Sequence, residues 1–122
     1  MNKLKQAFLQ NKDALKKIVV KEFGIDVYVS KWSGKDRAKI TPLAVEIEKL
    51  GDEEKYEEMF SMMAKIVQTT IKDENGDRIF DDSDEDFETV FNSDGEVLQN
   101  LFSEVMKHNG MTEEAVKEAA KN

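Results

Sequence analysis

The chain has 122 residues, no cysteine, and 26 acidic against 18 basic residues, which gives a net charge of −8 at neutral pH. This length fits one domain with a single hydrophobic core, and the lack of cysteine excludes a disulfide framework, a zinc–thiolate site and a thiol nucleophile. No stretch is long and apolar enough to span a bilayer, and the opening MNKLKQAFLQNKD is too polar for a signal peptide. We therefore expect a protein that stays where it is made and has no membrane partner.

The charge is unevenly distributed. Residues 1–39 carry ten basic and four acidic residues, whereas residues 40–122 carry eight basic and 22 acidic residues. Acidic residues outnumber basic residues over most of the chain. This argues against nucleic-acid binding, which requires cations facing phosphates. The opposite net charges of the two parts favour head-to-tail self-association, so a homo-oligomer is one expectation.

The N-terminal part predicts a short helix followed by a β-hairpin. Leu4, Ala7 and Phe8 fall at helical spacing among polar residues, so residues 1–15 are expected to form a short or fraying, mobile segment. Residues 16–32 are rich in β-branched and aromatic side chains and are expected to form a hairpin that reverses at Phe23–Gly24. Alternation places Val27 and Val29 on one face of its second strand.

The next segment predicts a helix that is interrupted once. Ser33 is the expected N-cap, and Pro42 predicts a break near Thr41, because proline cannot donate a helical hydrogen bond. Gly51 is the expected C-terminal stop.

Residues 52–72 predict a long amphipathic helix at the centre of the fold, with Asp52 as its N-cap. Its apolar stripe consists of Tyr56, Met59, Phe60, Met63, Ile66, Val67, Thr70 and Ile71. A core helix is the preferred interpretation. The alternative is that Met59, Met62 and Met63 form an adaptable docking surface, since methionine suits promiscuous binding faces.

Three more helices are expected in the C-terminal half. Ser83 is placed to cap the first of them, the second is expected to follow Asp94–Gly95, and Asn109–Gly110 is expected to end the second. Met111 and Val116 bracket Thr112 as a hydrophobic staple around the N-cap of the last helix. Together these elements predict an α+β fold, mostly α, in which an N-terminal hairpin packs on a bundle of about four to five helices. Residues 1–122 are expected to form one domain, with 33–122 as its helical body.

No motif for catalysis or metal binding is present. The acidic segment from Asp73 to Glu88 fails the calcium-loop pattern, because Gly76 comes two places early and Asp84 stands where a bidentate Glu is needed. His108, the single histidine, is expected to sit at a helix C-terminus, without a Ser or Asp motif around it. We expect a binding or assembly protein that is not an enzyme and has no cofactor and no metal site.

The order of elements nevertheless resembles a known family. Three stretches carry the resemblance: a strand followed by Ser33-Gly34-Lys35-Asp36-Arg37, a turn before Arg78-Ile79-Phe80 and an acidic helix start, and the junction Asn109-Gly110-Met111-Thr112 near the C-terminus. In a small, acidic, cysteine-free chain, this order is similar to that of the tail assembly chaperones of long-tailed bacteriophages.

The resemblance implies a small α-rich protein of the host bacterial cytoplasm. Such a chaperone binds the long tape measure protein, keeps it soluble during tail-tube assembly, and is absent from the mature virion. The resemblance also implies a longer frameshifted form that recruits the tail tube protein. Codons for Ala120, Lys121 and Asn122 permit a slippery heptamer at that point.

The partner-binding residues do not follow from a motif. Our hypothesis is that Phe23, Tyr28 and Trp32 on the hairpin act together with Val116 and Ala119 on the last helix. The alternative function is a structural head-to-tail connector or other small virion protein. An acidic adaptor or a DNA mimic is more remote, since the acids cluster in one turn region.

Overall fold

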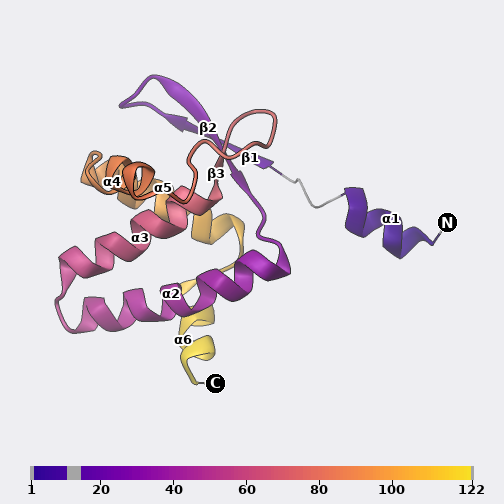
Figure 1. Cartoon of the computed structure of the whole chain (residues 1–122). Helices are drawn as coiled ribbons and strands as arrows, with labels where there is room; N and C mark the ends of the chain where they lie inside the picture. Colours follow the sequence, from indigo (N-terminus) through magenta and orange to yellow (C-terminus); the bar gives the residue numbers. More distant parts are fainter. Residues whose placement is uncertain (1, 11–14, 122) are drawn as a thin grey trace.

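The computed structural model describes residues 2–10 and 15–121. The elements are α1 (Lys3–Gln10), β1 (Leu15–Val20), β2 (Ile25–Ser30), α2 (Gly34–Asp52), α3 (Tyr56–Thr70), β3 (Ile71–Lys72), α4 (Asp84–Phe91), α5 (Gly95–His108) and α6 (Glu113–Lys121). The fold is α+β and mostly α, as predicted: an antiparallel sheet lies at one end of a helical body (Figure 1). The predicted mobile segment 1–15 falls partly outside the described residues, and its described part contains α1.

The predicted hairpin is formed by β1 and β2. Lys17 pairs with Tyr28 and Val20 with Ile25, and the chain reverses through Gly24, whose positive φ of 65° suits glycine. The inward side chains Val27 and Val29 are buried. This face packs on α5, where Lys16 Nζ also donates to Glu104 Oε2 over 2.8 Å. Apolar burial and the Lys16–Glu104 ion pair therefore both help to hold the hairpin to the helical body.

A third strand was not predicted. The central helix ends at Thr70 rather than Lys72, and Ile71–Lys72 pair with Tyr28 and Val29 as β3. Thr70 lies at the junction: its hydroxyl donates to the Ile66 carbonyl at 2.8 Å and accepts from Trp32 Nε1 at 2.9 Å. Ile71 is buried in β3, so the apolar stripe of α3 continues into this strand.

The predicted break near Thr41 is wrong, because α2 runs without interruption through Pro42. Proline in a helix interior costs about 3 kcal/mol. Ile40 and Ala44, two residues to either side of it, are both buried, and this packing offsets the lost hydrogen bond. Thr41 Oγ1 also donates to the Arg37 carbonyl at 2.7 Å.

The prediction that Asp52 is the N-cap of the central helix is also wrong. Asp52 is the last residue of α2, and α3 begins at Tyr56 after Lys55, which makes no side-chain capping bond. The reversal uses Glu54, whose φ is 58°, in place of a glycine. The expected stop at Gly51 is therefore one residue early. Placing Gly51 inside α2 lets α3 approach closely, since a Cβ there would meet Met59 Sδ at 3.3 Å.

The other helix ends agree with the sequence. Ser33 Oγ accepts from the Asp36 amide, and Ser83 Oγ accepts from the Asp86 amide. Asp94 Oδ1 accepts from the amides of Glu96 and Val97. These caps satisfy helical donors that would otherwise have no partner.

Asn109, expected only to end a helix, joins three elements. Its Oδ1 accepts from the Trp32 amide at 2.7 Å, and its Nδ2 donates to the Ser30 and Val105 carbonyls at 3.1 and 3.0 Å. Its own carbonyl accepts from Arg37 Nη1 at 2.9 Å. The side chain is buried, so it fixes the end of β2 and the start of α2 against the end of α5.

The core lies where α2, α3 and α5 meet the sheet. α3 is the central helix, in contact with α2, α4 and α5. The largest fully buried side chains are Ile40, Ile66, Ile71, Leu98, Val29, Val67, Val105 and Thr70. The interpretation of residues 52–72 as a core helix is confirmed for Tyr56–Thr70, although Tyr56 of the predicted apolar stripe is 55% exposed. Among the described residues, no helix has the length and hydropathy needed to cross a membrane.

Candidate functional site: a methionine-lined groove

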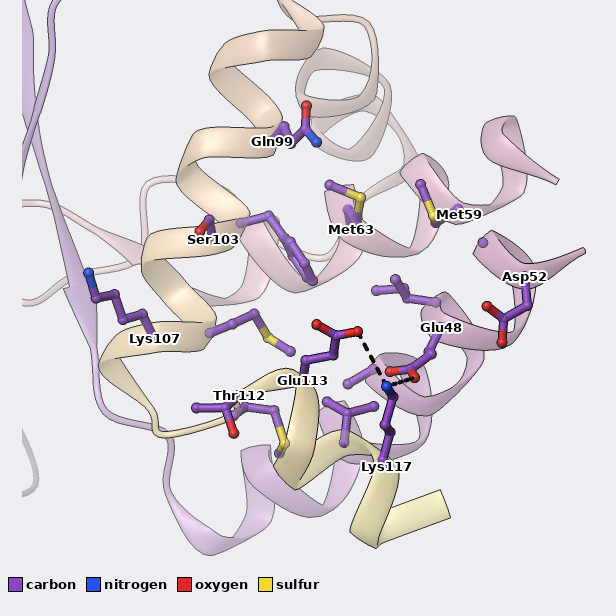
Figure 2. A pocket seen from close by; sticks show the side chains of 17 residues that line it. Glu48, Asp52, Met59, Met63, Gln99, Ser103, Lys107, Thr112, Glu113 and Lys117 are labelled. Carbon is purple, nitrogen blue, oxygen red and sulfur yellow. Dashed lines mark ion pairs between the residues drawn. The ribbon is translucent and has the colours of Figure 1, made fainter. Parts of the chain in front are cut away.

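An apolar groove of about 740 Å³ lies between α2, α3, α5 and α6. Figure 2 shows Met59 and Met63 of α3 on one side of it, and Gln99, Ser103 and Lys107 on the neighbouring α5. Thr112 and Glu113 come from the start of α6. Four helices therefore converge on one hollow.

The wall of the groove is rich in flexible apolar side chains. Met63, Met106 and Met111 are buried, whereas Met59 and Phe102 are half-buried and remain accessible from the groove. Methionine is unbranched and polarizable, so such a wall adapts to apolar side chains of different shape. Apolar contact with an inserted segment is the chemistry that this wall supports.

The turn before α6 places the start of that helix beside the groove. Gly110 adopts a φ of 67°, and the Met111 amide donates back to the Met106 carbonyl at 2.9 Å. Thr112 Oγ1 then accepts from the Ala115 amide at 3.1 Å, so α6 starts directly at the groove edge. The predicted N-cap at Thr112 is confirmed, and both residues of the predicted staple, Met111 and Val116, are buried.

The rim carries charges of both signs. Lys117 Nζ lies 3.9 Å from Glu48 Oε1 and 3.5 Å from Glu113 Oε1, as the dashed lines in Figure 2 show. Asp52 and Lys107 also line the groove. An apolar trough with a charged, solvated rim suits an amphipathic helix, which lays its apolar stripe into the trough and keeps its polar face in water.

The hairpin residues in the partner-binding hypothesis lie in different environments. Phe23 is 51% exposed at the turn, next to the exposed Val19 and Ile25. Tyr28 is half-buried. Trp32 is occupied structurally: its Nε1 bonds to Thr70, and the Arg37 guanidinium lies 5.9 Å from its ring centroid.

The two residues of α6 do not complete a surface with the hairpin. Val116 is only 6% exposed and belongs to the core cluster, while Ala119 is half-buried. Figure 1 places the hairpin turn and α6 at opposite ends of the body. Of the five residues in the hypothesis, Phe23 alone is an exposed aromatic anchor, and Val116 borders the methionine-lined groove from inside the core.

The three methionines of the alternative docking surface on α3 do not lie on one face of the helix. Met59 and Met63 face the groove, but Met62 lies on another side of α3, beside Glu58 and Phe91. Met106 and Met111, which complete the wall, were not predicted to bind a partner. Met111 was interpreted as part of a capping staple, and the groove appears only when α5 and α6 are placed beside α3.

Hydrogen bonds between side chains and backbone groups hold the acidic segment after β3 in place. Asp73 Oδ1 accepts from the amides of Asn75 and Asp77 at 2.9 and 3.0 Å. Gln68 Nε2 donates to the Asp81 carbonyl at 2.6 Å and thereby ties the segment to α3. Within residues 2–10 and 15–121, no three His, Cys, Asp or Glu side chains are grouped to hold a metal ion.

Two carboxylates outside the groove are perturbed by cations. The hydrogen bond from Lys16 lowers the pKa of Glu104 below its ordinary value of 4.5. The hydrogen bond from Arg78, whose Nη2 lies 2.8 Å from Asp82 Oδ1, lowers the pKa of Asp82 below 3.8. Both pairs stabilise the folded chain when the carboxylates are ionised.

We expect Lys16→Met to make the free energy of unfolding less dependent on pH between pH 7 and pH 3. Because the pKa of Glu104 is lower in the folded chain, the stabilisation is present above its unfolded pKa of 4.5 and is lost as the pH falls through the folded pKa. The Lys16 and Glu104 side chains are 40% and 35% exposed, so the loss of unfolding free energy at neutral pH should be only about 0.2–1 kcal/mol. Urea unfolding at pH 7 and at pH 3 measures it, with Lys35→Met as the control. An equal loss at both pH values would contradict this account.

No protein-family model, no curated protein and no solved structure matches this chain. The groove geometry and the sequence resemblance are therefore the two observations from which function is inferred.

Proposed function

We propose that this chain is a tail assembly chaperone of a long-tailed bacteriophage, and that it binds helical segments of the tape measure protein in the methionine-lined groove. The groove is the observation that carries the proposal, because it offers an open apolar trough of about 740 Å³ between four helices. A tape measure protein is long and helical, and exposes apolar seams until the tail tube encloses it. The trough has the chemistry to cover such a seam.

The net charge supports the same role. A chaperone must bind apolar surface and also keep the complex in solution, and these demands conflict on an uncharged surface. Here the wall is apolar, while the chain as a whole carries a net charge of −8. Mutual repulsion between separate complexes would then keep coated clients dispersed in the host cytoplasm.

Co-expression with the tape measure protein of the same phage tests the proposal. The wild-type chain should increase the soluble fraction of the client, and Met59→Glu should abolish the increase, because it places a carboxylate in the apolar wall. Met62→Glu is the matched control: it makes the same substitution on the same helix, but outside the groove. We expect this control to retain chaperone activity.

Two results would contradict the proposal. One is a client that is equally insoluble with and without the wild-type chain. The other is recovery of this chain as a stoichiometric component of purified particles, which would favour the head-to-tail connector.

A longer frameshifted form is part of the proposal, with recruitment of the tail tube protein as the role of its extra domain. In the part of the chain that the structure describes, α6 runs to Lys121 and carries the small residues Ala115, Ala119 and Ala120. Asn122, the other residue of the proposed slip site, lies outside the described residues. The coding DNA decides this point: codons without the heptamer A-AAA-AAC would remove the frameshift and leave the groove unaffected.

A further inference from the structure

Helix α1 presents an apolar face that the body does not cover. Leu4, Phe8 and Leu9 are 64%, 73% and 57% exposed. Lys3 and Lys5 flank Leu4 in the sequence, and α1 contains no acidic residue. The Asn2 side chain caps the helix by accepting from the Leu4 amide at 2.8 Å. α1 is therefore a capped, basic, amphipathic helix, and the part of the chain that the structure describes leaves its Leu4, Phe8 and Leu9 largely exposed.

A hollow of about 390 Å³ on the other side of α3 has the complementary character. Its apolar part consists of Leu50, Met62 and Phe91, and its acidic part of Glu46, Glu57 and Glu58. No basic residue lines it among the residues that the structure describes. Lys55, which interacts with Glu58 and Glu46, is already paired with Glu53 at 3.1 Å.

We propose that α1 of one copy docks in the acidic hollow (Glu46, Leu50, Glu57, Glu58, Met62, Phe91) of a second copy. Leu4 and Phe8, one helical turn apart, would lie over the apolar part. The lysines on either side would then meet the glutamates that border it. Charge complementarity selects this hollow over the methionine-lined groove, whose rim carries both signs and whose Lys117 would face the lysines of α1.

This contact is heterologous, because the two surfaces that meet are different. Each copy has one α1 and one acidic hollow, so repetition gives a ring or an open head-to-tail array, and a reciprocal exchange of α1 between two copies gives a closed pair. An eight-residue helix buries less than the roughly 1,200 Å² typical of a stable interface, so association should depend on protein concentration. Salt should weaken it, since charges are screened within about 3 Å at 1 M.

Sedimentation of the full chain over a range of concentrations tests the proposal through a charge exchange. The wild-type chain should form species larger than a monomer at low salt. Lys3→Glu with Lys5→Glu should abolish this association, as should Glu57→Lys with Glu58→Lys. The four substitutions together should restore it, because the charges again oppose each other across the contact. Phe8→Ser, at an exposed position outside the core, should abolish association without changing the melting temperature.

A wild-type chain that stays monomeric at every concentration would overturn the proposal, and so would a charge exchange that fails to restore association. If the α1 substitutions abolish association but the glutamate substitutions do not, α1 binds at another site, and the proposal is also overturned. The proposal is independent of the proposed function: Met59→Glu should leave self-association intact, and Lys3→Glu with Lys5→Glu should leave client binding intact.

Discussion

Asn109→Ala should lower the free energy of unfolding by about 2–5 kcal/mol, an unusually large effect for a residue at a helix end. The substitution removes the acceptor of the Trp32 amide and the donor to the Ser30 carbonyl. Each buried polar group left without a partner costs about 1–3 kcal/mol. Urea unfolding followed by circular dichroism measures the change.

Asn92→Ala is the matched control for this prediction. Asn92 also caps the C-terminus of a helix, but its side chain is exposed and bonds only to Glu88 one turn earlier. Its loss should cost less than about 1 kcal/mol. Equal effects at the two positions would show that Asn109 is an ordinary cap and not the junction of β2, α2 and α5.

Ile66→Ala should be comparably destabilising, by about 2–5 kcal/mol, because it opens a cavity at the centre of α3. Ile66 is fully buried, and its helix contacts α2, α4 and α5. The midpoint of urea unfolding should fall accordingly. Ile79→Ala removes the same atoms from a side chain that is 44% exposed, and we expect a much smaller loss. A small effect at Ile66 would show that the core collapses to fill the space.

The sequence was most informative where one local signal decided the structure. Ser33 and Ser83 cap helices as their types and positions indicated, because capping depends on residues within a single turn. The hairpin followed from the alternation of β-branched residues. These features require no knowledge of distant parts of the chain.

Sequence reasoning was wrong where packing outweighs a local preference. Pro42 indicated a break, but burial of the neighbouring turns keeps α2 continuous. Ile71 continued a helical stripe, yet a strand pairing with Val29 buries it equally well. In both cases a partner distant in the sequence determines the conformation, and its position is known only once the chain has folded.

The candidate site was the least predictable part of the molecule. Met59, Met106 and Met111 lie on three different segments, and each has an adequate explanation as a core or capping residue. The groove exists because α5 and α6 do not close completely over α2 and α3. No residue pattern in the sequence indicates this incomplete closure.

The central claim is that the methionine-lined groove binds tape measure helices, and direct titration of a purified helical tape measure segment tests it most directly. We expect the wild-type chain and Met62→Glu to bind alike. Met59→Glu should bind at least about tenfold more weakly while remaining folded, since one buried methionine is worth roughly 1.5–3 kcal/mol and a carboxylate opposes burial. Equal affinity of Met59→Glu and the wild-type chain would contradict the claim.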